Sequence, residues 1–107
     1  MKLYTIRDAT IGKFFTRLFM LHNDEQAKRL MQQSVLGGDE AMSANPDCYT
    51  LYRVGAYDDD TGIPIGHDPE RVCTGIEAYT QGLRDRERLE DLQRQMADIT
   101  APPPDEE

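Results

Sequence analysis

Residues 49–65, with the sequence YTLYRVGAYDDDTGIPI, constrain the fold of this chain more than any other stretch. The first half is rich in β-branched and aromatic residues, which suit a pleated, half-buried strand. Aspartates at 58–60 and Gly62 then supply a turn, because Asp side chains bond to nearby backbone and glycine adopts positive φ without steric cost. The pattern predicts a β-hairpin. Pro64 cannot donate to a ladder, so the second arm is expected to be an edge strand or a bulge.

The stretch before this hairpin begins with a predicted strand over residues 3–6, LYTI. Residues 9–22 are ambiguous, because their apolar residues fit a helix face nearly as well as a buried strand. We favour an irregular connection through Gly12, followed by a strand near residues 17–21.

A helix is expected from Asn23 to about Leu36. Asn is a strong N-cap, the next two residues are acidic where the helix dipole favours negative charge, and Gln26 occupies the capping-box position. Gly37 is expected to end the helix with a left-handed cap. The polar residues 39–47 then predict an exposed loop.

Beyond the hairpin, residues 66–69 (GHDP) predict another turn. Residues 70–74 predict a last short strand with Val72 pointing inward. Cys73 in this strand is expected to be a small packed residue.

Strong helix formers predict a long helix over residues 76–99, with two apolar stripes that are out of phase. The first stripe is expected to pack on the domain, and the second to form a short heptad seam with little of its own domain beneath it. A partly frayed, solvated helix resting on the body competes with self-association and with docking to a partner. The first stripe is Ile76, Tyr79 and Leu83, and the second is Leu89, Leu92, Met96 and Ile99.

These elements predict one α+β domain, with a small antiparallel sheet of three to five strands, one packed helix and a long C-terminal helix. A chain of 107 residues has room for one core and not for two. We expect residues 1–75 to form the core domain, residues 76–99 the C-terminal helix, and residues 100–107, rich in proline and acid, a disordered tail.

The chain has no apolar run approaching the roughly 20 residues that span a bilayer, and its N-terminus lacks the apolar stretch of a signal peptide. A cytosolic location is therefore expected. Cys48 and Cys73 are then expected to be free thiols, because that compartment is reducing.

The net charge of -8 disfavours a protein whose main task is to grip naked phosphate backbone, since such proteins cluster Lys and Arg. The charge is unevenly distributed, because residues 1–30 hold six Lys and Arg against three Asp and Glu. The sequence thus allows a basic N-terminal face on an acidic body.

No motif predicts catalysis, a metal or a cofactor. The aspartates at 58–60 do not fit a Ca²⁺ loop, because Gly62 is fifth where the loop needs a sixth-position glycine, and Pro69 stands where a bidentate Glu is required. The cysteines and histidines do not have the spacing of zinc ligands. Nothing in their spacing supports a cysteine nucleophile activated by a histidine base, and the sequence has no glycine-rich phosphate-binding loop. An enzyme is not expected. The residues of zinc-binding type without that spacing are His22, Cys48, His67 and Cys73.

A binding surface is better supported. Tyrosines at 49, 52 and 57 together with Arg53 place aromatic faces and a cation on a sheet, the combination that single-stranded nucleic acid binders use for base stacking. Strand tyrosines are also common at the edge of a core, and the acidic turn lies next to these, so both interpretations stay open.

Three segments resemble the small nonstructural protein of gokushovirus-type microviruses, the phage open-reading-frame-five family. They are the opening LYTIRD, the helix start NDEQAKR at residues 23–29, and YTLYRVGAYDDDTG in the hairpin. The resemblance covers about residues 1–75, and the extension beyond them is longer than the family leads us to expect.

The resemblance implies a non-capsid, non-enzymatic accessory protein made in the cytoplasm of the infected bacterium. The family is described as DNA-binding, or as acting in the switch from duplex replication to single-stranded genome synthesis and packaging. No catalytic residue is carried over. If DNA is bound, the positions to test are Lys2, Arg7, Lys13, Arg17, Lys28, Arg29, Tyr52 and Arg53.

Two classes of function follow. In the first, the protein acts in single-stranded DNA replication or packaging by binding a phage or host replication protein, through its acidic surface and the seam from Leu89 to Ile99. In the second, it binds single-stranded DNA directly through its basic first third and the tyrosine strand. A homodimer through the C-terminal helix is compatible with either.

Overall fold

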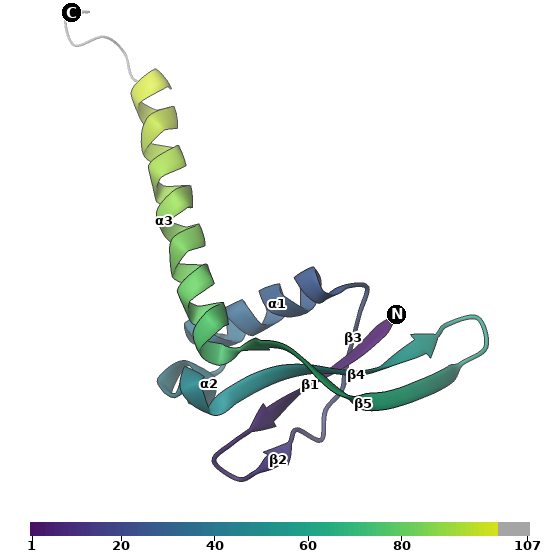
Figure 1. Cartoon of the computed structure of the whole chain (residues 1–107). Coiled ribbons are helices and arrows are strands. Elements are labelled where there is room, and N and C mark those ends of the chain that lie inside the picture. The colour runs from purple at the N-terminus through teal and green to yellow at the C-terminus, as the bar shows by residue number, and fades with distance from the viewer. Residues whose placement is uncertain (101–107) are drawn as a thin grey trace, which may run out of the picture.

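The computed structural model describes residues 1–100, with the side chains of residues 1–98, and shows an α+β fold. A curled antiparallel sheet carries α1 and α2 on one side, and α3 leaves the end of the sheet and projects from the body (Figure 1). The predicted fold class is confirmed. In chain order the elements are β1 (Lys2–Asp8), β2 (Lys13–Phe14), β3 (Phe19–Leu21), α1 (Asp24–Gln33), a π-helical turn (Ser34–Gly38), α2 (Glu40–Ala44), a 3-10 turn (Pro46–Cys48), β4 (Tyr49–Asp58), β5 (Ile63–Thr74) and α3 (Gly75–Thr100).

β1 is the central strand of the sheet. β4 pairs with one edge of it, and β2 and β3 pair in succession with the other. The chain bulges out between β2 and β3, and the hydroxyl of Thr5 lies 3.2 Å from the carbonyl oxygen of Arg17 in this bulge. The expected first strand, irregular connection and second strand are therefore confirmed in outline. Sequence periodicity did not reveal β2, because two residues are too few to show a period.

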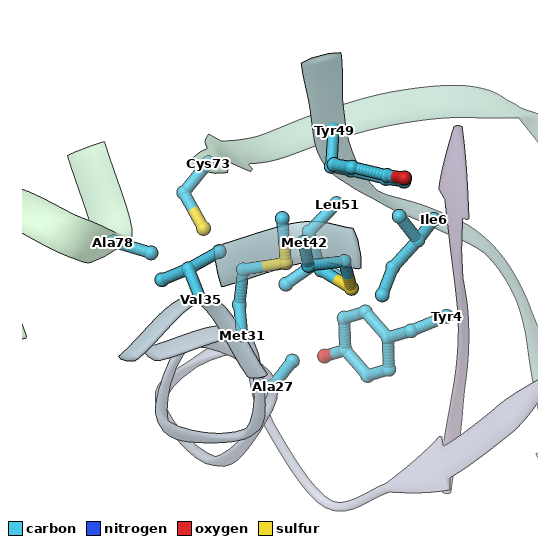
Figure 2. Close-up of a cluster of buried hydrophobic side chains, with 10 residues drawn as sticks. All are labelled: Tyr4, Ile6, Ala27, Met31, Val35, Met42, Tyr49, Leu51, Cys73 and Ala78. Carbon is cyan, nitrogen blue, oxygen red and sulfur yellow. The ribbon is translucent and has the colours of Figure 1, made fainter. Parts of the chain in front are cut away.

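α1 covers one face of this sheet. The side chain of Asn23 accepts a hydrogen bond of 2.9 Å from the amide of Gln26, so the predicted N-cap is confirmed. Ala27, Met31 and Val35 are fully buried and meet residues of β1, β4 and β5 in a single core (Figure 2). The helix ends through the π-helical turn, in which Gly37 has φ of 129°, a region that glycine tolerates best.

The prediction of an exposed loop over residues 39–47 was wrong. α2 forms there, with Asp39 as its N-cap accepting from the amide of Met42, and Met42 is only 2% exposed. A helix of five residues with a single buried apolar side chain has no visible amphipathic period, so its polar residues resembled a loop. The cap at Asp39 was the available signal.

The hairpin of β4 and β5 is confirmed. The carboxylate of Asp58 accepts from the backbone amides of Asp60 and Thr61, at 2.9 and 3.3 Å, and Gly62 has φ of 74°. β5 is an edge strand, as Pro64 predicted, since it pairs only with β4 in the described sheet.

The turn predicted at residues 66–69 was wrong, because β5 continues through them. The pairing steps from Gly55 opposite Gly66 to Arg53 opposite Glu70, so the intervening residues form a bulge. Pro69 lacks an amide hydrogen, and a bulge in an edge strand accommodates it without reversing the chain. In the expected final strand Val72 is half-buried, whereas Cys73 is buried as predicted.

α3 is confirmed as a long helix, but its predicted packing face was wrong. Ile76, Tyr79 and Leu83 are 47%, 37% and 39% exposed. The helix instead packs on the body through small residues, Gly75, Ala78 and Gly82, and a methyl group on Gly82 would collide with Leu36. A count of large apolar residues overlooks such a contact, because small residues allow close approach without contributing to the apolar stripe.

The residues of the expected seam on α3 are exposed: Leu89 by 56%, Leu92 by 49% and Met96 by 64%. They lie on the half of the helix that projects from the body (Figure 1). The side chain of Ile99 and the tail at 101–107 lie outside the described residues.

Candidate functional site

The two faces of the sheet have different surroundings. Tyr4 and Ile6 of β1 and Leu51 of β4 point toward α1 and belong to the core (Figure 2). Side chains alternate along a strand, so Arg7 of β1 and Tyr52 of β4 point to the opposite face. None of the helices among residues 1–100 covers that face, but the segment between β2 and β3 shields Thr5, which is 3% exposed and donates to the carbonyl oxygens of Phe15 and Arg17.

An aromatic pair lies on this face, which no described helix covers. Phe14 of β2 stands opposite Arg7 of β1, and its ring contacts that of Tyr52 edge to face, with centroids 5.4 Å apart and planes at 72°. Phe14 is 40% exposed and Tyr52 is half-buried. Such a contact fixes the relative orientation of the two rings, and Phe14 remains accessible to solvent.

Three cations lie near this pair. Lys13 and Arg17 line one shallow recess together with Phe14, and the guanidinium of Arg7 lies beside Gly12 in the turn between β1 and β2. The Arg17 guanidinium also lies 5.5 Å from the ring centre of Phe19, a cation–π arrangement. We call Arg7, Lys13, Phe14, Arg17 and Tyr52 the basic–aromatic patch.

The sequence singled out four of these five residues. Phe14 was missed, because the apolar run at residues 14–21 did not show which of its members would be buried. The available signal was the adjacency of Phe14 to Lys13 in a segment that has more bases than acids.

The other four candidate residues lie elsewhere. Lys2 is at the far end of β1, opposite Leu21. Lys28 and Arg29 are on α1, and the groove that they line between α1 and α3 also contains Glu25 and Asp85. The structure therefore does not gather the eight candidates on one surface.

Arg53 is engaged on the helix-covered face. Its guanidinium forms an ion pair with Glu70 of β5 and lies 3.5 Å from the carboxylate of Asp24. Asp24 also accepts a hydrogen bond of 2.6 Å from the hydroxyl of Tyr4. Burial, followed by this hydrogen bond, raises the pKa of Tyr4, so its phenol stays protonated. This network joins α1 to β1, β4 and β5, which are neighbours in the sheet. Tyr52 and Arg53 are adjacent in sequence but lie on opposite faces of the sheet.

The ion pair between Arg53 and Glu70 gives a pH-dependent prediction. The hydrogen bond from Arg53 holds the pKa of Glu70 below its ordinary value of 4.5, so the pair stabilises the fold above that pH and ceases to do so as pH falls through the folded-state pKa. We expect Glu70→Gln to lower the melting temperature at pH 7, with a difference from wild type that shrinks below about pH 4. Thermal melts between pH 7 and 3 measure this, with Glu90→Gln on α3 as control. A difference that grows on acidification would contradict it.

The two cysteines and the clustered aspartates are the other groups of chemical interest among the described residues. Burial raises the pKa of Cys73 to about 11, so its thiol is a poor nucleophile, and Cys48 also has a raised pKa. Asp58, Asp59 and Asp60 place carboxylate oxygens within 4.8 Å of one another, but all three are exposed, and Asp58 accepts the hydrogen bonds of the turn. Turn formation accounts for this cluster.

None of the helices described for residues 1–100 has the length and apolar character needed to cross a membrane. The fold defines a small α+β domain with a long projecting helix. A family model described as Phage ORF5 protein matches residues 1–78, and the chain therefore belongs to the phage ORF5 protein family. No curated protein and no solved structure matches the chain. The matched region contains the whole sheet and ends in the first turn of α3, so most of that helix lies beyond it.

Proposed function

We propose that this phage protein is a non-enzymatic accessory protein that binds single-stranded DNA through the basic–aromatic patch. The observation that carries the proposal is the ring contact of Phe14 with Tyr52 on the sheet face that no described helix covers, with Arg7 opposite Phe14 and with Lys13 and Arg17 in the recess that Phe14 lines. An accessible aromatic ring stacks on any unpaired base, and cations at its sides neutralise phosphates. Such a protein acts on the single-stranded genome during replication or packaging, in the cytoplasm of the infected host.

The acidic remainder of the molecule is consistent with this function. A net charge of -8 opposes general adhesion to duplex DNA, so only the patch would contact nucleic acid. Asp8, the acid closest to the patch in sequence, accepts hydrogen bonds from the amide and hydroxyl of Thr10, which places its carboxylate in the turn. Binding should be modest in affinity and strongly dependent on salt.

A second candidate function is action through a phage or host replication protein. The exposed apolar residues Leu89 and Leu92 on the projecting half of α3 favour it, because large exposed apolar side chains in a row are typical of interaction surfaces. The two functions are compatible, since the patch and the projecting half of α3 are separate surfaces.

Charge reversal tests the proposed function. Arg7→Glu combined with Arg17→Glu is expected to weaken binding to a labelled single-stranded oligonucleotide by at least about tenfold at low salt, because it removes two phosphate contacts and adds two repulsive charges. Fluorescence anisotropy measures the affinity. Arg84→Glu combined with Arg94→Glu changes the net charge equally on α3 and should retain nearly full affinity. Equal loss in both double variants would assign the effect to overall charge and contradict the patch.

Phe14→Ala tests stacking without changing charge or removing a buried side chain. Stacking of one base on an aromatic residue is worth about 1–3 kcal/mol, so binding should weaken by about fivefold or more. Ile11→Ala, an exposed apolar residue of the same recess, serves as control. Unchanged affinity in Phe14→Ala would show that base stacking on Phe14 does not contribute to binding.

A further inference from the structure

α3 carries one continuous stripe whose character changes where the body ends. Gly75, Ala78 and Gly82 are buried against the body. The same stripe continues at alternating spacings of three and four through Asp85, Leu89, Leu92 and Met96. The residues are small where the helix contacts its own domain, and large where it projects from it (Figure 1). We propose that the projecting half of α3 pairs with the same segment of a second copy of this chain, in antiparallel orientation.

The charges on α3 support a second copy as the occupant. On the helix surface the positions directly beside the large apolar residues are Arg86, Arg88, Gln93 and Gln95. The carboxylates of residues 87, 90, 91 and 98 lie on the opposite half of the helix surface. Two chains of net charge -8 repel one another in general. The flanks of this stripe contain no carboxylate, so that repulsion is weak where the stripes of two copies would meet.

Asp85 selects the orientation. A parallel pair aligned on the stripe sets Asp85 against Asp85 of the other copy, and like charges facing each other in a seam are destabilising. An antiparallel pair sets Leu89 opposite Leu92 of the second copy and Asp85 opposite its Met96. It also sets Arg88 beside Gln95 of the second copy, so cations do not meet. The antiparallel arrangement further places the two globular bodies at opposite ends of the helix pair.

A recess at the foot of the projecting half fits this arrangement. It lies where α3 leaves the body, and its floor includes Leu36 and Gly82. Antiparallel pairing brings the end of the second helix, beyond Met96, to this recess, so the contact extends from the seam onto the body. The recess is lined by Gln32, Gln33, Leu36, Gly38, Gly82, Asp85, Arg86 and Leu89.

The pairing should be weak, because a contact between two short helix segments lies at the low end of specific interfaces, below about 1,200 Å². Light scattering and sedimentation velocity on the full chain should therefore show a mass that rises from monomer toward dimer over a concentration range on the order of 10–500 μM. A wild-type chain that stays monomeric across this range overturns the proposal, and would leave an unrelated protein as the occupant of the seam.

Leu92→Lys should remove the dimer, since it places a charge at the centre of the seam while keeping a strong helix former. The matched control is Leu83→Lys, which makes the same change on the other stripe of α3, at a residue 39% exposed compared with 49% for Leu92. The control should dimerise like wild type. A dimer that survives Leu92→Lys, or that Leu83→Lys abolishes equally, overturns the assignment to this stripe.

Gln95 tests the orientation. In the antiparallel pair, Gln95→Glu places a carboxylate beside Arg88 of the second copy at two symmetric positions, whereas Gln95→Arg places a cation there. The dissociation constants of these two variants should differ by about tenfold, the glutamate variant binding tighter, with a difference that shrinks at high salt. In a parallel pair Gln95 does not face Arg88, so equal constants would contradict the antiparallel orientation.

Discussion

Alanine at Gly75 is expected to destabilise this protein by about 2–3 kcal/mol. A methyl group at this position would overlap the carbonyl oxygen of Pro46 and lie 3.1 Å from the carbonyl oxygen of Tyr49. Both obstacles are backbone atoms, held by the 3-10 turn and by β4, so neither can rotate away as a side chain can. Since domains of this size are stable by only about 5–15 kcal/mol, the melting temperature should fall by about 10–20 °C.

The matched control for Gly75→Ala is Gly66→Ala in β5. The nearest atom to a methyl group there is the carbonyl oxygen of Val54 at 3.9 Å, an ordinary contact. This change should alter stability by less than about 0.5 kcal/mol. Thermal and urea unfolding of both variants measure the contrast, and equal stabilities would show that the first residue of α3 is not held against the turn at residues 46–48.

Met42→Ala should cost about 2–5 kcal/mol, the usual range for emptying the site of a buried methionine. Met42 is 2% exposed and anchors α2 in the core (Figure 2). The same change at Met20, which is 51% exposed on β3, should cost less than about 1 kcal/mol.

This pair of variants distinguishes the observed α2 from the exposed loop that the sequence predicts. If Met42 lay in a solvated loop, its side chain would stabilise the fold no more than that of Met20. The two alanine variants would then have the same free energy of unfolding. Urea unfolding, with the free energy extrapolated to zero denaturant, is the appropriate measurement.

The elements that the sequence predicted well are those that carry local signals. The capping side chain of Asn23 indicates the start of α1, and Asp58 and Gly62 indicate the hairpin turn. Both depend on hydrogen bonds between near neighbours in the chain, so they can be recognised without knowing the tertiary structure.

Two of the misjudged elements depend on contacts distant in sequence. Gly82 has no apolar side chain to mark it, yet it lies against the side chain of Leu36 where α3 packs on the body. Residues 66–69 carry a strong turn signal, but pairing with β4 keeps them within one strand as a bulge. Tertiary packing decided both, and it does not appear in local composition.

In the candidate site, the sequence identified the basic first third but not its arrangement. Strand alternation separates Tyr52 from Arg53, and β2 and β4 flank β1 so that the rings of Phe14 and Tyr52 come into contact across it. Arg53 illustrates why composition alone overcounts cations, since two carboxylates from α1 and β5 engage it.

The most direct test of the proposed function is the affinity of the wild-type chain for a labelled 20-nucleotide single strand, measured by anisotropy from about 25 to 200 mM NaCl. With Arg7, Lys13 and Arg17 as phosphate contacts, the logarithm of the association constant should fall with the logarithm of salt with a slope of about -2, and the matching duplex should bind more weakly. No detectable binding at the lowest salt, or an affinity that does not change with salt concentration, would contradict single-stranded DNA binding through the basic–aromatic patch.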